Sequence, residues 1–218
     1  MKENKFVEIL KKIFWSFAWI PVLVVGVDLL TKWLVQTHLH NGQQITIIPN
    51  FCFVTLEHNL GAAWSMGGSG ELHWRIIWIC VSVLLSAGLT FYLIKQFKKL
   101  SNPYRIAISL MIGGAVGNMI DRAFYWHAIV GFDGVIDWIS FYFGSLGYFP
   151  TFNVADSCLV IGVFILILVM VIELIQDAKK KAKEGAYSMT PKEYEAKKEA
   201  EEKATEEPKT EEEKDAKN

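Results

Sequence analysis

The pattern of hydrophobic and polar positions divides the 218-residue chain into four long apolar stretches, separated by segments rich in polar or turn-forming residues. The apolar stretches cover residues 13–35, 76–94, 104–122 and 154–175. A helix needs about 20 apolar residues to cross about 30 Å of hydrocarbon, so the pattern predicts a membrane-spanning helix in each stretch. Glycines and Asn118 interrupt the third stretch. Small residues let helices approach closely, which predicts that the third helix is interior to the bundle.

The segment between the first two stretches follows a different pattern. Residues 44–48 and 51–57 alternate in polarity or are rich in β-forming side chains, and Pro49 and Asn50 between them are a turn signal. This pattern predicts a small antiparallel sheet within residues 43–66. The expected fold class is therefore an all-α polytopic membrane protein, with four transmembrane helices and a small extracytoplasmic β-sheet between helices one and two.

The distribution of Lys and Arg predicts the orientation in the membrane. Basic residues precede the first stretch, surround the short joint between the second and third, and follow the fourth, whereas residues 37–74 and 123–152 contain none. Because cytoplasmic segments are enriched in Lys and Arg, both termini are predicted to be cytoplasmic and those two loops extracytoplasmic. Residues 1–177 form the predicted membrane domain, and residues 178–218 form a charged cytoplasmic tail that is disordered or partly helical.

Composition narrows the possible partners. Hydrophobic residues make up 52% of the chain, and the formal net charge is −1. No nucleic-acid-binding face is expected, because the basic residues lie at membrane edges or are mixed with Glu in the tail. Cys52, Cys80 and Cys158 show neither metal-ligand nor disulfide spacing, so no metal or cofactor is expected.

Asp137 and Asp156 are the strongest candidates for chemistry. Each lies in or beside membrane-spanning sequence, where an ionisable side chain is costly unless it is paired, hydrated or protonated, and marks a functional site by default. Two such carboxylates that converge would share one proton, the arrangement that activates water in aspartic proteases. The predicted topology collects polar residues from position 28 to 156 near the outer membrane surface. A buried hydrogen-bonding pair without catalytic chemistry is the structural alternative.

Five short motifs occur in order along the chain: DLLTK at residues 28–32, NLGAA at 59–63, GGAVGNMIDR at 113–122, VIDW at 135–138 and FNVAD at 152–156. In this order, on a chain with four spanning helices, they closely resemble lipoprotein signal peptidase, or signal peptidase II, a family of bacterial inner-membrane aspartic proteases. The resemblance implies cleavage of prolipoproteins before the diacylglyceryl-modified Cys, with Asp137 and Asp156 as the catalytic pair. Prolipoprotein substrates and membrane lipid are the expected partners, and a monomer is the expected state.

The other polar residues of these motifs are expected to bind substrate or to support the pair. Asn153 is expected to hold Asp156 or a substrate carbonyl, and Asn59 to contact the peptide. Asn118 and Arg122 are expected to orient the outer loop or to bind the substrate backbone.

Three further assignments complete the predicted site. Gly61 lies in a stretch of small residues that permits close approach to a ligand, although an ordinary turn is the alternative. Asp28 and Lys32 are four positions apart on one helix face and can pair, in a structural or lipid-facing role, with direct chemistry as the alternative. Asp133, in a loop longer than is usual for the family, is an alternative to Asp137.

A different class of function uses the same kind of residue. A proton-coupled transporter or channel also carries intramembrane acids, but places them along a route through the bilayer. Here the predicted acids gather at one outer level, and no inverted repeat is evident in the sequence. The peptidase is therefore the favoured interpretation.

Overall fold

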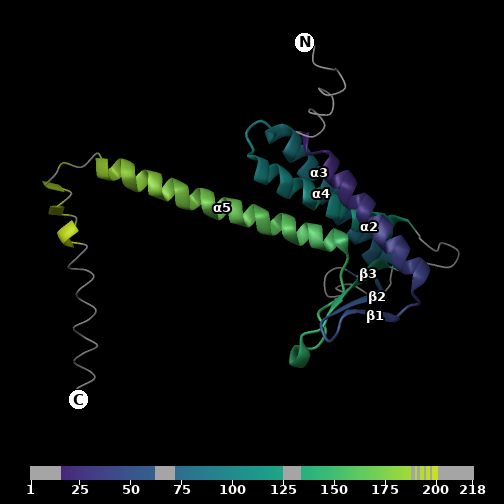
Figure 1. Cartoon of the computed structure of the whole chain (residues 1–218). Helices are drawn as coiled ribbons and strands as arrows, with labels where there is room; N and C mark the ends of the chain where they lie inside the picture. Colours follow the sequence, from purple (N-terminus) through teal and green to yellow (C-terminus); the bar gives the residue numbers. More distant parts are fainter. Residues whose placement is uncertain are drawn as a thin grey trace, which may run out of the picture. The chain divides into compact units, whose positions relative to one another are not determined.

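Four helices of the computed structural model are long and apolar enough to cross a membrane (Figure 1). The structure describes residues 16–61, 72–124, 134–187 and most of 190–200. The four helices are α2 (Trp19–His38), α3 (Leu72–Gln96), α4 (Asn102–Ala123) and α5 (Val154–Tyr187). A one-turn 3-10 helix, η2 (Gly144–Leu146), is the fifth helix of the described part of the chain. The prediction of four spanning helices is confirmed.

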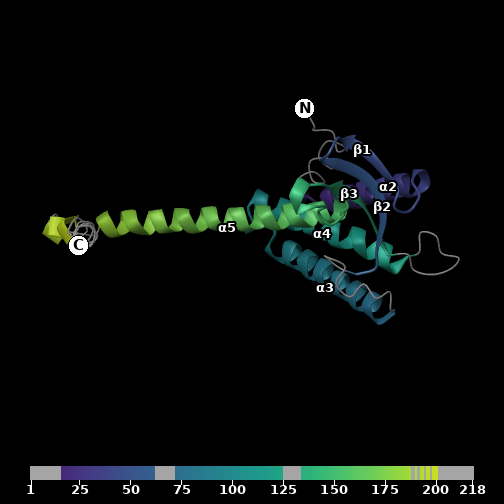
Figure 2. The ribbon, with the colours of Figure 1, turned by 90° about the horizontal axis from the view of Figure 1, so that it is seen from below.

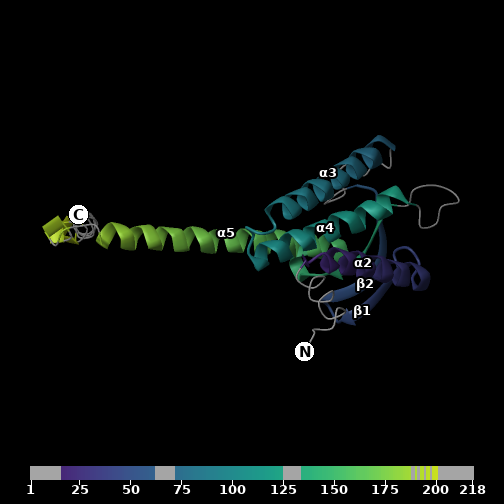
Figure 3. The ribbon, with the colours of Figure 1, turned by 90° about the horizontal axis from the view of Figure 1, so that it is seen from above.

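Helix α4 lies between α2 and α3, as both views along the vertical axis show (Figure 2, Figure 3). It is the most buried of the four helices, as the sequence predicts. Glycines make this packing close: a Cβ atom on Gly113 would lie 2.7 Å from the Cβ of Val24 in α2. A Cβ on Gly114 would overlap the carbonyl oxygen of Ala155, at the start of α5.

Strands β1 (Gln44–Ile48), β2 (Cys52–Asn59) and β3 (Val135–Phe141) form one antiparallel sheet in the order β1-β2-β3. The first two strands lie where the sequence predicts a hairpin. The restriction of the sheet to the segment between helices one and two is wrong, because β3 comes from between α4 and α5. The sequence predicts a loop there, because the apolar residues of 135–141 do not alternate regularly with polar ones as in a half-buried strand.

One face of the sheet packs on the C-terminal end of α2. Leu56 of β2 and Ile136 of β3 join Val35 and Leu39 in one buried apolar cluster. Because successive side chains of a strand point to opposite faces, this packing turns Asp137 toward the other face of β3.

The chain returns along β3 before it enters α5. After η2, Phe149 donates its N–H to the carbonyl of Phe141, and Phe152 exchanges main-chain hydrogen bonds with Ile139. This return places Asn153, the residue that precedes α5, next to the strand that carries Asp137. The two carboxylate motifs therefore converge through a local hairpin.

The last helix continues past the predicted boundary of the membrane domain, as far as Tyr187. The helical residues described beyond it, between 192 and 200, are exposed. Residues 201–218 of the predicted tail lie outside the described residues, so the disordered or partly helical state of that tail stays a prediction.

Candidate active site

The ammonium group of Lys32 lies at the centre of a buried polar cluster. Its Nζ donates to Asp28 Oδ2 at 2.6 Å, to Asp121 Oδ2 at 2.8 Å and to Asn118 Oδ1 at 3.2 Å. The side chains of Lys32, Asp28 and Asp121 are all 0% exposed. A buried ammonium is very unfavourable without partners, and here each of its three N–H groups has an acceptor. The predicted pairing of Asp28 with Lys32 is confirmed, and the pair is buried.

This cluster joins four elements of the fold. Asp28 of α2 accepts the main-chain N–H of Ala155 at 2.9 Å, one of the N–H groups that the first turn of α5 leaves unpaired. Asp121 of α4 accepts the N–H of Ile136 in β3 at 3.3 Å. The two carboxylates therefore fix the start of α5 and the strand of Asp137 against α2 and α4.

Asn153 and Asp156 form a reciprocal cap at the start of α5. Asn153 Oδ1 accepts the N–H of Asp156 at 2.9 Å, and Asp156 Oδ2 accepts the N–H of Asn153 at 3.2 Å. This is the capping-box arrangement, with Asn and Asp in the usual places of Ser or Thr and Glu. It locks the rotamer of Asp156 and leaves the amide nitrogen of Asn153 directed away from the helix.

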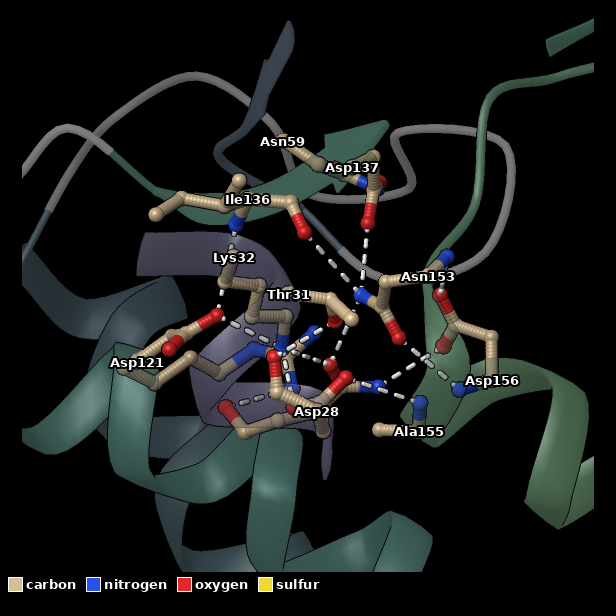
Figure 4. A network of polar contacts seen from close by, with 12 residues as sticks. Asp28, Thr31, Lys32, Asn59, Asp121, Ile136, Asp137, Asn153, Ala155 and Asp156 are labelled. Carbon is tan, nitrogen blue, oxygen red and sulfur yellow. Dashed lines mark hydrogen bonds and ion pairs between the residues drawn. The ribbon is translucent and has the colours of Figure 1, made fainter. Parts of the chain in front are cut away.

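Three asparagine amides hold the two predicted catalytic carboxylates, and Figure 4 shows Asn153 between Asp137 and Asp156. Asp137 accepts from Asn153 Nδ2 at 2.7 Å and from Asn59 Nδ2 at 3.1 Å. Asp156 accepts from Asn118 Nδ2 at 2.7 Å. The amides of Asn118 and Asn153 also bond to each other, at 3.0 Å. The structure thus brings Asp137 and Asp156 into one hydrogen-bonded network.

Burial is the main reason why the pKa of Asp137 is raised from 3.8 to about 7. Its side chain is only 3% exposed, and the charge of Asp156 raises the pKa further. Hydrogen bonds from Asn59 and Asn153 and the charge of Lys32 act in the opposite direction. Near neutral pH, Asp137 therefore exchanges readily between the acid and the carboxylate, as one member of an interacting pair does.

Arg122 and Gly61 lie at the edge of this network. Arg122 Nη2 donates to the carbonyl of Gly61 at 3.0 Å, and the N–H of Gly61 donates to Asn59 Oδ1 at 2.9 Å. The main-chain N–H and the carbonyl of Gly61 are therefore both hydrogen-bonded. The structure brings together every site residue that the sequence predicts: Asp28, Lys32, Asn59, Gly61, Asn118, Arg122, Asp137, Asn153 and Asp156.

Arg75 joins the C-terminal end of α4 but was not singled out from the sequence. From the first turns of α3, its guanidinium donates to the carbonyls of Arg122 at 2.7 Å and Ala123 at 3.3 Å. A lone Arg directly after a long segment without Lys or Arg was the available signal. Asp133, the alternative to Asp137, lies outside the described residues.

The donor set of the site is made of carboxylates, amides, one ammonium and one guanidinium. Within the part of the chain that the structure describes, no three His, Cys, Asp or Glu side chains gather as metal ligands would. The two carboxyl groups of the site can transfer protons and accept hydrogen bonds.

Four apolar helices and a buried carboxylate–asparagine network at the adjoining ends of α4 and α5 define a multi-pass membrane protein with an acidic site. Residues 20–172 match the family model described as signal peptidase II. This match covers more than half of the chain, so the chain belongs to the signal peptidase II family, which is a family of proteases.

Relatives in several bacteria agree with this assignment. A lipoprotein signal peptidase of Symbiobacterium thermophilum is 39% identical over 70% of this chain and 92% of its own length. One from Geobacillus kaustophilus is 37% identical over 71% of this chain and 92% of its own length. A solved bacterial membrane enzyme, determined by the in meso method at 2.3 Å resolution, superposes with a TM-score of 0.61 at 32% identity. It covers 76% of this chain and 91% of its own.

Proposed function

We propose that this protein is an aspartic endopeptidase that removes signal peptides from diacylglyceryl-modified prolipoproteins, cutting before the lipidated Cys. Family membership and the names of its relatives support the substrate class. The observation that carries the mechanism is the position of Asn153, whose side-chain Nδ2 donates to Asp137. Its side-chain Oδ1 accepts the main-chain N–H of Asp156, and its own main-chain N–H donates to the Asp156 carboxylate. Two carboxyl groups joined in this way can divide the roles of acid and base.

Asp156 takes the part of the base in this proposal. It lies at the N-terminus of α5, where the helix dipole favours an anion, and it accepts N–H groups from Asn118 and Asn153. Its carboxylate removes a proton from water, whose oxygen attacks the carbonyl carbon of the scissile peptide bond. Asp137, with its pKa of about 7, donates its proton to the carbonyl oxygen as the tetrahedral intermediate forms.

Collapse of the intermediate restores both groups. The carbon–nitrogen bond breaks, and the leaving amine takes the proton that Asp156 holds. Asp137 recovers its proton from the hydroxyl that becomes the carbonyl of the new carboxylic acid. No proton or electron is left over, and both carboxyl groups return to their starting states.

The remaining site residues support this chemistry. Asn59, Asn118 and Asn153 position the carboxyl oxygens, and Arg122 with Gly61 orients the segment after β2 for contact with the substrate peptide. Asp28 and Lys32 fix the helices. The enzyme is a bacterial inner-membrane protein that acts on prolipoprotein as a monomer surrounded by lipid, with both termini in the cytoplasm and the sheet and site near the extracytoplasmic surface.

The decisive experiment is cleavage of a lipidated prolipoprotein by purified protein in detergent. Asn is nearly the same shape as Asp but cannot exchange a proton, so Asp137→Asn and Asp156→Asn should each reduce the rate by at least about 10²–10⁴-fold. Both variants should still insert in the membrane. Addition of EDTA should leave the wild-type rate unchanged.

Four outcomes would contradict the proposal. Near-normal turnover by both variants would rule out a mechanism that uses this carboxylate pair. Turnover by the Asp137 variant alone would indicate Asp133 as the second catalytic carboxylate. Loss of activity with EDTA that one divalent ion restores would show that a metal takes part. Ion flux in liposomes without any cleavage would favour the transporter or channel.

A further inference from the structure

Arg75 places a guanidinium at the end of α4, where the main chain lacks hydrogen-bond partners. The last carbonyls of a helix have no partner within the helix, and they form the negative end of its dipole. Arg75 Nε donates to the carbonyl of Arg122 and Arg75 Nη2 to that of Ala123, at 2.7 and 3.3 Å. A planar guanidinium can bind two neighbouring carbonyls at once, which a Lys ammonium does less well.

A continuous chain of hydrogen bonds leads from this contact to Asp137. Arg75 holds the main chain of Arg122, and the side chain of Arg122 donates to the Gly61 carbonyl at 3.0 Å. The N–H of Gly61 donates to Asn59 Oδ1 at 2.9 Å, and Asn59 Nδ2 donates to Asp137 Oδ2 at 3.1 Å. Each residue after Arg75 therefore receives its orientation from the one before it.

This chain reaches Asp137 from a different direction than the other side-chain contacts of the site, although Arg122 Nη1 also donates to the main-chain carbonyl of Asn118 at 3.4 Å. Asn153 donates to the other carboxyl oxygen of Asp137, Oδ1. Lys32 donates to the side chain of Asn118, which in turn donates to Asp156 Oδ1. The chain from Arg75 ends at Asp137 Oδ2. It also connects the site to α3, which lies beside α4 (Figure 3).

We propose that Arg75 is a positioning residue for the peptidase reaction, which aligns Asp137 through Arg122, Gly61 and Asn59. The inference rests on the proposed function, because it assigns a purpose to the orientation of Asp137. Arg75 does not touch the reacting atoms. It holds the last turn of α4 so that the Arg122 guanidinium meets the Gly61 carbonyl.

The same helix pair contains a matched control. At the opposite end, Arg105 of α4 donates from Nε and Nη2 to the carbonyl of Phe97, after the end of α3, at 3.1 and 2.7 Å. Arg105 thus makes the same kind of helix-end contact as Arg75, but at the end of the pair far from Asp137. Removal of either guanidinium removes a main-chain contact between α3 and α4, and only one of the two contacts leads to the site.

The experiment compares Arg75→Ala, Arg75→Lys and Arg105→Ala by cleavage of a lipidated prolipoprotein. Misplacement of a catalytic group by about 1 Å can cost about 10²-fold in rate, so Arg75→Ala should lower kcat by about 10- to 100-fold with little change in KM. Arg75→Lys should recover part of the loss. Arg105→Ala should stay within about twofold of wild type, even where its thermal stability falls as far as that of Arg75→Ala.

Two further measurements separate positioning from general stability. In a double-mutant cycle, Asn59→Ala breaks the chain, so adding Arg75→Ala should reduce the rate little further. The pH profile of Arg75→Ala should also change. The hydrogen bond from Asn59 lowers the pKa of Asp137, so a looser Asn59 should move the alkaline limb of the profile to higher pH.

Equal losses of kcat in Arg75→Ala and Arg105→Ala would overturn the inference, as would additive effects of Arg75→Ala and Asn59→Ala. These results are distinguishable from a failure of the proposed function. If Asp137→Asn keeps its activity, the proposed function fails whatever Arg75 does. If Asp137→Asn is inactive and Arg75→Ala behaves like Arg105→Ala, only the positioning role is lost.

Discussion

Neutral amides, rather than cations, contact the two carboxyl groups of the site. Asn59, Asn118 and Asn153 donate hydrogen bonds without adding charge. The Lys32 charge is largely matched by Asp28 and Asp121, so it lowers the pKa of Asp137 less than burial and Asp156 raise it. A cation bonded directly to Asp137 would favour its ionised form and remove the proton that the proposed mechanism needs.

The raised pKa of Asp137 predicts how activity and stability depend on pH. Activity should fall as the pH rises through about 7, because Asp137 then loses its catalytic proton. Stability should also decrease as the pH rises from about 4 to about 7, because the folded state keeps a proton that the unfolded chain has lost, at about 1.4 kcal/mol per pKa unit. Asp137→Asn should therefore be more stable than wild type at pH 8, with little difference at pH 4.

Thermal unfolding of both proteins in detergent at the two pH values measures this difference. Asp156→Asn under the same conditions controls for the loss of one carboxyl group. An equal gap between wild type and Asp137→Asn at pH 4 and pH 8 would show that folding does not raise the pKa of Asp137.

Among the secondary-structure elements, the site depends on the contact between α4 and the first turn of α5. Asn118 and Asp121 come from the last turns of α4, and Asp156 from the first turn of α5. Gly114 and Gly117 allow the two helices to meet: a Cβ on Gly117 would lie 2.8 Å from Asp28 Oδ2 and 3.0 Å from the Cβ of Ala155. The glycines thus determine how closely the carboxyl groups and their amides approach.

Substitution of Gly114 tests this packing. A Cβ there would overlap the carbonyl oxygen of Ala155 and lie 2.7 Å from Leu159, so Gly114→Ala should displace the start of α5 and lower the cleavage rate at least about tenfold, as expected for misplaced catalytic groups. Gly88→Ala in α3 is the matched control, because a Cβ there has nothing within 4 Å. It should keep full activity and gain up to about 1 kcal/mol of helix stability. Equal activity of the two variants would contradict the packing argument.

The elements also show which features a sequence reveals. Long apolar runs predict the spanning helices because each run meets the length requirement by itself, and the motif residues around Asp137 and Asp156 were all found. Strand β3 was missed because two spanning helices, α3 and α4, separate it in sequence from its partner β2. Pairing between strands so far apart in the sequence leaves no local signal. The contacts of Arg75 with carbonyls of a different helix also lie beyond local sequence patterns, and only its place after a long segment without Lys or Arg marks it.

On the scale of the whole molecule, the polar site lies at one end of the spanning helices. Asp121 lies in the last turn of α4 and Asp156 in the first turn of α5. The two segments that lack Lys and Arg, 37–74 and 123–152, connect to this same end of the helices. The orientation rule therefore predicts that this end, with the site, faces the extracytoplasmic side.

Cysteine labelling tests this orientation. In a variant without Cys52, Cys80 and Cys158, a membrane-impermeant thiol reagent added from the extracytoplasmic side should label Gln43→Cys and leave Lys183→Cys unlabelled. Both positions are exposed in the structure, so a difference in labelling reports the side of the membrane. After permeabilisation both should react. Labelling of Lys183→Cys alone in intact cells would reverse the orientation.

The Asp28–Lys32 pair also matters before the fold is complete. Asn118 follows Lys32 by 86 positions, and Ala155 follows Asp28 by 127, so during synthesis α2 reaches the bilayer before either partner exists. A charged side chain within a spanning helix opposes insertion, by up to about 2.5–3.5 kcal/mol at the helix centre. Because the two residues are four positions apart, each supplies the counter-ion of the other within a single helix. The nascent segment can therefore enter the membrane as a neutral unit. The Lys32 ammonium, first paired with Asp28 alone, later gains Asn118 and Asp121 as further acceptors.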